Sequence, residues 1–169
     1  MSIKKICLYG AESTGKTTLG KLLAEHYKTV FVPEMARVIL GDKLCVAEDF
    51  PAIAYAQFGE VARQMLYANR VLICDTDLLI TKVYEEHYFG SVHTEVTDLQ
   101  QLEHYDLYLM CDTDIPWVAD SQRILGHLRE EMKAKFVKEL EEKNIKYHWI
   151  RGDYQTRFDT AVRLIDALL

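Results

Sequence analysis

Short runs of apolar residues alternate along this chain with longer segments in which apolar residues recur every three or four positions. The short runs are typical of β-strands, which we expect at residues 3–9, 27–32, 71–74, 105–111 and 145–150. The longer segments are typical of helices, which we expect around residues 19–26, 49–70, 78–87, 125–140 and 158–168, with a short helical piece near Glu34. This alternation predicts a three-layer α/β/α fold around a five-stranded, mostly parallel sheet, with ligands at the carboxyl ends of the strands.

The segment between the first predicted strand and the first predicted helix carries a phosphate-binding sequence. Residues 10–17 read Gly-Ala-Glu-Ser-Thr-Gly-Lys-Thr, a complete G-x-x-x-x-G-K-[ST] pattern. The glycines let the backbone curl around an anion, Lys16 reaches the β- and γ-phosphates, and the Thr17 hydroxyl can ligate Mg²⁺. The pattern predicts a fold of the P-loop NTPase type, in which a nucleoside triphosphate is bound by Gly10, Glu12, Ser13, Thr14, Gly15, Lys16, Thr17 and Thr18.

Two aspartates follow the apolar run at residues 71–74. Asp75 stands at the end of this run, where phosphate-loop enzymes place an acid that holds Mg²⁺, so we predict that Asp75 and Thr17 ligate the metal. Asp77 follows two positions later, and one carboxylate can serve the metal while the other accepts a proton from the attacking hydroxyl. The sequence leaves open which aspartate is the base, and Asp75 with Thr76 can instead cap the next helix.

Residues that can bind a phosphate acceptor follow two of the predicted strands. Glu34 and Arg37, three positions apart on a first helical turn, can receive sugar hydroxyls and a phosphate, or else form a surface ion pair. Trp117 can stack on a planar, cationic ring, or else packs within a lid. We predict that the acceptor is bound by Glu34, Arg37, Asp77 and Trp117.

We expect residues 113–130 to form a helical lid over the site. Arg123 and Arg129 lie in this segment, where arginines can clamp the transferred charge, or else face solvent on a helix. After the last predicted strand, the segment from Arg151 to Tyr154 can border an adenine, although the turn itself also needs a glycine. We predict catalytic roles for Lys16, Asp75, Asp77, Arg123 and Arg129, and nucleotide contacts from Arg151, Gly152 and Tyr154.

Five segments of the chain match one known family in order and in spacing. They are the phosphate loop with its internal Glu12-Ser13, Val32-Pro33-Glu34-Met35-Ala36-Arg37, Asp75-Thr76-Asp77, Asp114-Ile115-Pro116-Trp117-Val118 and Gly152-Asp153-Tyr154-Gln155-Thr156-Arg157-Phe158. Together they resemble the ribosylnicotinamide kinase domain of bacterial NadR proteins, within the P-loop kinase superfamily. The resemblance runs from about residue 3 to residue 165 and departs at Asp120-Ser121-Gln122-Arg123, where those proteins usually have Asp-Gly-x-Arg.

This resemblance implies ATP-dependent phosphorylation of the ribose 5′-hydroxyl of nicotinamide riboside, with Mg²⁺, to give nicotinamide mononucleotide. The flat, cationic nicotinamide ring suits stacking on Trp117. Two alternatives remain open: a kinase for another nucleoside or nucleotide, and a regulatory module that senses nucleotides without turnover. NadR proteins carry further domains before the kinase, whereas the first predicted strand begins here at residue 3, so we expect a stand-alone kinase domain over residues 1–169.

Composition and charge restrict the partners. The formal net charge of −6, without a basic stripe, argues against nucleic-acid binding. No apolar run approaches the length of a membrane span and no signal peptide precedes the first strand, so we expect a cytoplasmic protein. The four cysteines form no C-x-x-C pair and are expected to be free thiols. The sequence does not indicate an oligomeric state.

Overall fold

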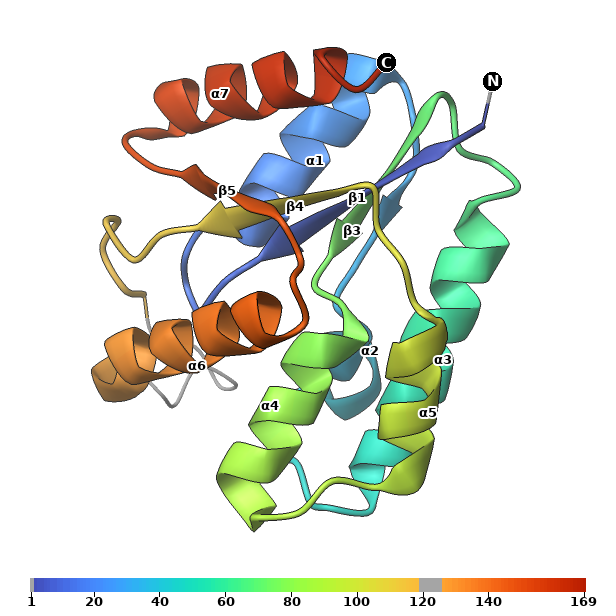
Figure 1. Cartoon of the computed structure of the whole chain (residues 1–169), viewed down its shortest axis with the longest axis vertical. Coiled ribbons are helices and arrows are strands. Elements are labelled where there is room, and N and C mark those ends of the chain that lie inside the picture. Colours follow the sequence, from blue (N-terminus) through green and yellow to red (C-terminus); the bar gives the residue numbers. More distant parts are fainter. Residues whose placement is uncertain (1, 119–125) are drawn as a thin grey trace.

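Parallel strands form the central sheet of the computed structural model (Figure 1), which describes residues 2–118 and 126–169. Within these residues the strands are β1 (Lys4–Tyr9), β2 (Phe31–Val32), β3 (Val71–Asp75), β4 (Leu107–Cys111) and β5 (Tyr147–Ile150). Their order in the sheet is β2-β3-β1-β4-β5, and the pairings between them are all parallel. The predicted five-stranded sheet is confirmed.

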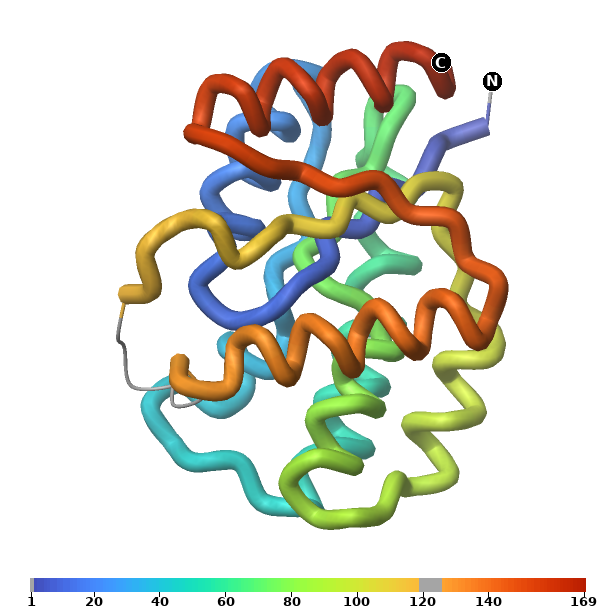
Figure 2. Tube along the Cα trace, turned by 60° about the vertical axis from the view of Figure 1, so that its left-hand side comes forward, coloured from blue at the N-terminus to red at the C-terminus, as the bar shows by residue number. Residues whose placement is uncertain are grey.

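Helices cover both faces of this sheet, as Figure 1 and Figure 2 show. The described helices are α1 (Lys16–Tyr27), α2 (Met35–Leu40), α3 (Asp49–Gln64), α4 (Leu78–Phe89), α5 (Thr94–Leu102), α6 (Arg129–Glu142) and α7 (Tyr154–Asp166). On β1, Ile6 and Leu8 pack with α1 and α7, whereas Cys7 and Tyr9 pack with α4 and α6. Successive side chains of a strand point to opposite faces, so a strand covered on both sides is apolar throughout. The predicted three-layer arrangement is therefore confirmed.

The direction in which the chain crosses the sheet reverses at β1. The chain passes first to β2 and β3 on one side of β1, and then to β4 and β5 on the other. At such a reversal the connections leave in opposite directions and open a crevice beyond the carboxyl ends of the strands. The phosphate loop, which joins β1 to α1, lies at this crevice.

Some boundaries differ from the sequence predictions. The strand expected at residues 27–32 is reduced to β2, because α1 continues to Tyr27 and ends where Lys28 adopts a left-handed conformation with φ of 50°. Helix α5 was not predicted; of its residues only Val96 is buried, so its apolar stripe is weak. The helix expected over 49–70 ends at Gln64, and the turns that follow connect it to β3.

The predicted lid at residues 113–130 is described in part. Residues 113–118 form neither helix nor strand, a 3₁₀ turn spans Gly126–Leu128, and α6 follows directly. The helix expected from residue 125 therefore begins at Arg129. Residues 119–125, and with them the predicted Arg123, lie outside the described part of the chain.

The four cysteines are free thiols, as predicted. Cys7, Cys74 and Cys111 are buried in strands, and Cys45 is partly buried before α3. Burial raises the pKa of the Cys45 thiol to about 11, so this thiol is protonated at neutral pH. Across residues 2–118 and 126–169, no helix has both the length and the apolarity needed to cross a membrane.

Candidate functional site

A cavity of about 380 Å³ opens beside the phosphate loop. Its walls include the loop and the start of α1, the segment from Glu34 to Cys45, and residues of α3 and α4. The sequence-predicted residues that line it are Gly10, Glu12, Ser13, Thr14, Gly15, Lys16, Thr17, Thr18, Glu34 and Arg37. The fold therefore brings the predicted phosphate-binding residues and two predicted acceptor residues to one cavity.

The phosphate loop needs glycine at two positions for different reasons. A Cβ on Gly10 would lie 2.6 Å from the carbonyl oxygen of Cys111, and the φ of Gly10 is +138°. Gly15 is the N-cap of α1 with φ of 80°, a left-handed conformation that turns the chain into the helix. A side chain at the first position would displace β4, and one at the second would strain the backbone.

Lys16 lies inside the curl of the loop. Its Nζ donates to the carbonyl oxygens of Gly10 and Ala11, at 2.8 Å in each case. Thr14 Oγ1 donates to the Ala11 carbonyl at 2.9 Å. Only 9% of Lys16 is exposed, so its ammonium charge is largely shielded from solvent. A shielded positive charge at this place interacts strongly with a bound phosphate.

Thr17 and Asp75 meet at the carboxyl end of β3. Thr17 Oγ1 donates to Asp75 Oδ2 at 2.5 Å, while Asp75 Oδ1 is buried without a hydrogen-bond partner. Burial raises the pKa of Asp75 to about 6; the charge of Lys16 opposes this rise and that of Glu34 adds to it. The side chain is therefore poised to ionise close to neutral pH.

The oxygens of this pair fit Mg²⁺. Mg²⁺ prefers hard oxygen ligands, and proteins commonly hold it with one or two carboxylates and the phosphates of the substrate. Asp75 Oδ1 is an unpartnered carboxylate oxygen, and the Thr17 hydroxyl lies beside the same carboxylate. No group of three or more His, Cys, Asp or Glu side chains in the described ranges could hold a metal by itself, so phosphates and water would complete the ligand set.

Asp77, like Asp75, is not among the residues that line the cavity. Its Oδ1 accepts from the backbone amide of Ile80 at 2.9 Å, which makes it the N-cap of α4. Burial raises the pKa of Asp77, and the neighbouring Glu103 adds to the rise. In a continuous strand Asp75 and Asp77 would share a face, but Thr76 between them has φ of 67° and breaks the alternation. The two acids consequently have different surroundings.

Sequence patterns did not reveal the aromatic wall of the cavity. Tyr84 and Tyr88 of α4 stack with their ring centroids 6.0 Å apart and an interplanar angle of 15°, and both line the cavity. Phe50, Ile53, Ile80 and Phe89 also contribute to the lining. The available signal was the four-residue spacing of the aromatic stripe on α4. Such a stripe ordinarily faces a core, so only the fold shows that it faces a cavity.

Polar side chains line the same cavity. Arg37 Nε donates to Glu34 Oε2 at 3.4 Å, which is the ion pair that the three-residue spacing offers as the alternative to acceptor binding. Gln57 Oε1 accepts from the backbone amide of Met35 at 2.9 Å, which fixes the orientation of the side-chain amide. Gln57 Nε2 is then left buried without a partner. Leaving a buried amide without a hydrogen-bond partner costs about 1–3 kcal/mol of folding free energy. Such an unpartnered group is typical of a site that binds a polar ligand.

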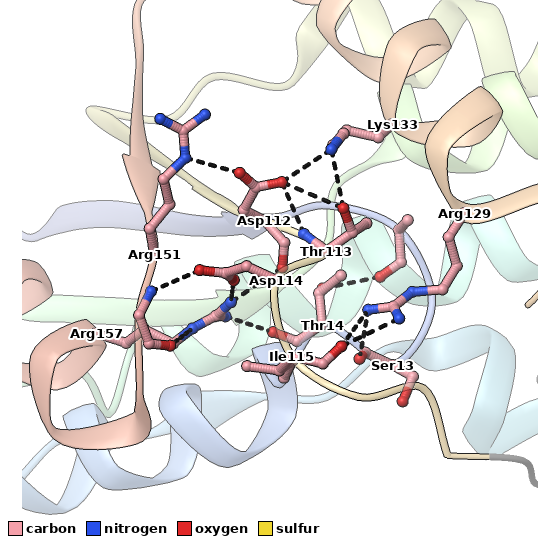
Figure 3. Close-up of polar contacts among 12 residues, drawn as sticks. Ser13, Thr14, Asp112, Thr113, Asp114, Ile115, Arg129, Lys133, Arg151 and Arg157 are labelled. Carbon is pink, nitrogen blue, oxygen red and sulfur yellow. Dashed lines mark hydrogen bonds and ion pairs between the residues drawn. The ribbon is translucent and has the colours of Figure 1, made fainter.

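Trp117 and Arg129 lie near the phosphate loop but do not line the cavity. The Trp117 ring packs on Gly126, where a Cβ would come within 2.4 Å of it. Arg129 donates to the carbonyl oxygen of Ser13 at 3.2 Å and to that of Ile115 at 3.1 Å (Figure 3). Its guanidinium group therefore joins the segment after β4 to the phosphate loop.

The predicted adenine-bordering residues lie on the segment between β5 and α7. Arg151 Nε donates to Asp112 Oδ2 at 2.7 Å, and its guanidinium lies 4.5 Å from the centroid of the Trp149 ring. Gly152 has φ of 91°, as a turn requires. Tyr154 lies next to the phosphate loop, with Cε1 3.6 Å from the place of a Cβ on Gly15. The cavity lining includes none of Arg151, Gly152 and Tyr154.

Arg157 contacts the phosphate loop as well, although the sequence patterns assigned it no role. It belongs to α7 and is only 2% exposed. Arginines within terminal helices are usually at the surface, and the available signal was the place of Arg157 in the family-matching segment from Gly152 to Phe158.

Comparison with known proteins identifies the family. A family model described as an AAA domain matches residues 5–157. The chain belongs to this family. It is also homologous to the trifunctional NAD biosynthesis/regulator protein NadR of Escherichia coli (strain K12), with 31% identity over 99% of the chain. The chain spans 43% of the length of that relative.

Solved structures agree with this family. A crystal structure of NadR protein in complex with NR is 25% identical, with a TM-score of 0.75 over 98% of this chain and 50% of that one. A second, in complex with NAD and AMP-PNP, is 25% identical, with a TM-score of 0.78 over 98% and 48%. A thymidylate kinase from Ehrlichia chaffeensis, 17% identical, shares the fold with a TM-score of 0.70 over the whole of both chains. The resemblance to NadR and the P-loop kinase fold are confirmed.

Proposed function

We propose that this protein transfers the γ-phosphoryl group of ATP to the ribose 5′-hydroxyl of nicotinamide riboside, giving nicotinamide mononucleotide and ADP. One observation carries the proposal: the phosphate loop with its Thr17–Asp75 pair opens into a cavity walled by the stacked rings of Tyr84 and Tyr88. The relationship to NadR structures in complex with NR and with AMP-PNP supports both the acceptor and the donor.

The phosphate loop would hold the triphosphate. Loops of this sequence bind β- and γ-phosphates through backbone amides and the lysine, here Lys16. Thr17 and Asp75 would hold Mg²⁺, which when bound neutralises charge on the phosphates during transfer. Arg129, whose guanidinium contacts the loop at Ser13, would add positive charge on the side of the segment after β4. Arg151, Gly152 and Tyr154 would border the adenine.

The aromatic wall suits a flat cationic acceptor. Positive rings are attracted to the faces of aromatic rings, and a desolvated contact of this kind contributes about 2 kcal/mol. Glu12 and Glu34 line the same cavity and add negative charge close to Tyr84 and Tyr88. Because these rings line the cavity and Trp117 does not, we place recognition of the nicotinamide on α4. Glu34, Arg37 and Gln57 would bind the ribose.

In the reaction the ribose 5′-oxygen bonds to the γ-phosphorus while the bond from that phosphorus to the β-bridging oxygen breaks. ADP leaves, and the hydroxyl proton passes to a carboxylate or to water. Of the two aspartates we place Asp75 beside the transferred phosphoryl group, because its Oδ1 has no hydrogen-bond partner next to Thr17, whereas the Asp77 carboxylate caps α4. Phosphoryl transfer depends mainly on positioning and charge, so the base contributes less than the phosphate loop does.

ADP release from purified protein over a panel of acceptors tests the proposal. Nicotinamide riboside is expected to give ADP well above a blank without acceptor, together with nicotinamide mononucleotide by mass spectrometry. Uridine, thymidine and thymidine monophosphate, which carry neutral bases, are expected to stay near the blank because the aromatic wall favours a cationic ring. The Lys16→Ala variant controls for contaminating kinases.

The alternatives give different results in the same assay. A higher rate with thymidine or with a nucleotide would show that the acceptor assignment is wrong. ATP binding without ADP release over any acceptor would indicate a nucleotide-sensing module instead of a kinase.

The apparent affinity for Mg²⁺ is expected to fall below pH 6. The pKa of Asp75 is raised to about 6, and a protonated carboxyl cannot ligate the metal. At pH 5 about a tenth of this group is ionised, so about tenfold more Mg²⁺ is needed for half-maximal rate than at pH 7.5. Mg²⁺ titrations of the rate at the two pH values measure the shift. An equal Mg²⁺ requirement at the two pH values would show that Asp75 is not a ligand of the metal.

A further inference from the structure

Arg157 joins three connecting segments at the carboxyl edge of the sheet (Figure 3). Its Nε donates to the carbonyl oxygen of Gly152 at 2.8 Å, and one terminal nitrogen donates to that of Thr14 at 2.8 Å. The other terminal nitrogen donates to the Asp112 carbonyl at 3.0 Å and pairs with Asp114 Oδ1. A single buried side chain therefore connects the phosphate loop, the segment after β4 and the turn after β5.

These contacts depend on the shape of the guanidinium group. Arginine presents five N–H donors in a rigid plane, and Arg157 donates from each of its three nitrogens in a different direction. Lysine has a single donor atom and cannot span the same acceptors. Asp114 supplies the opposite charge that a buried cation needs, and its second oxygen accepts from the Gly152 amide at 2.7 Å.

The contact with Thr14 bears on the phosphate loop itself. In a trans peptide the carbonyl group and the following amide point in opposite directions, and the described backbone contains no cis peptide. By holding the Thr14 carbonyl, Arg157 fixes the direction of the Gly15 amide. Arg129 holds the Ser13 carbonyl and in the same way fixes the Thr14 amide. Both amides belong to the part of the loop that binds phosphate in this motif.

We propose that Arg157 is a positioning residue of the nucleotide site. It does not touch the nucleotide; it sets the direction of a phosphate-binding amide and locks the phosphate loop to the turn at Gly152. The inference rests on the proposed binding of a nucleotide at this loop and does not depend on the identity of the acceptor.

The test is the affinity for a fluorescent ADP analogue, measured by titration without any acceptor. Arg157→Lys keeps the charge but loses the planar donors, and is expected to weaken ADP binding about tenfold or more. Asp114→Asn replaces one of the two acceptor oxygens with a donor and is expected to weaken binding about threefold or more. Arg163→Gln, on the exposed side of α7, is the matched control and should stay within about twofold of wild type.

A second readout separates positioning from general stability. In the kinase assay, KM for ATP is expected to rise in Arg157→Lys and Asp114→Asn, while KM for nicotinamide riboside stays within about twofold. Unchanged ADP affinity in folded Arg157→Lys, or an equal rise in both KM values, would overturn the inference. If Arg157→Lys fails to fold, the same two measurements on Asp114→Asn decide: unchanged ADP affinity, or an equal rise in both KM values, would overturn the inference. Normal ADP binding by wild type without turnover would overturn the proposed acceptor and leave this inference standing.

Discussion

Replacing Lys16 with alanine is expected to lower kcat by about 10³-fold while the fold persists. The Lys16 ammonium is held by the Gly10 and Ala11 carbonyls, at the centre of the phosphate loop and largely shielded from water. Charge that develops on the transferring phosphoryl group would lose the cation that this motif supplies to the β- and γ-phosphates. The measurement is kcat of the purified variant at saturating substrates, with circular dichroism to show that the helices remain.

Lys21→Ala provides the matched control, because Lys21 lies exposed on the same helix. It should retain the wild-type rate. Near-normal turnover in Lys16→Ala would contradict the assignment of the phosphate loop as the site of transfer. A similar loss in both variants would point to a general disturbance of α1.

Asp75→Asn is expected to lower kcat by about 10²–10³-fold and at the same time to raise the stability of the fold. The activity falls because a neutral amide is a poor ligand for Mg²⁺ next to Thr17. The stability rises because the pKa of Asp75, about 6 in the fold against 3.8 ordinarily, shows that the buried charge is unfavourable at pH 7. A shift of this size corresponds to about 3 kcal/mol, which is an upper bound for the gain.

The stability effect has a definite pH dependence. The folded carboxyl binds its proton more tightly than the unfolded one, so this group contributes stability that is present below pH 4 and lost as the pH rises through about 6. Asparagine does not ionise, so the gain of Asp75→Asn in thermal melts should be larger at pH 8 than at pH 5. Asp98→Asn, at an exposed site on α5, should show neither effect. Wild-type activity in Asp75→Asn, or a gain that does not change with pH, would contradict the assignment.

The sheet and the phosphate loop could be predicted because their sequence signals are direct consequences of local physics. A strand that is covered on both faces must be apolar, as in β4 and in the buried part of β1 from Ile6 to Tyr9. Gly10 has no room for a Cβ against Cys111, and Gly15 must adopt a left-handed conformation. The glycines of the motif therefore indicate the backbone conformation of the loop directly. These demands are local in the chain and remain visible in the sequence.

The rest of the candidate site depends on contacts that the sequence does not display. The left-handed conformation of Thr76 turns the side chains of Asp75 and Asp77 toward different surroundings. A threonine between two acids gives no sequence signal for this conformation. The aromatic stripe with Tyr84 and Tyr88 has the spacing of an ordinary core face. Arg157 acquires its partners only when three loops meet at one edge of the sheet.

The two sides of the cavity come from separate stretches of the chain. The aromatic and polar wall is built from residues 34–89, whereas the phosphate loop is held from behind by residues 112–157. Residues 34–64 and 78–89 can therefore vary without disturbing this anchoring, as long as β3 with Asp75 between them is kept. Exchanging residues 34–64 and 78–89, with β3 retained, is therefore a direct route to kinases for new acceptors.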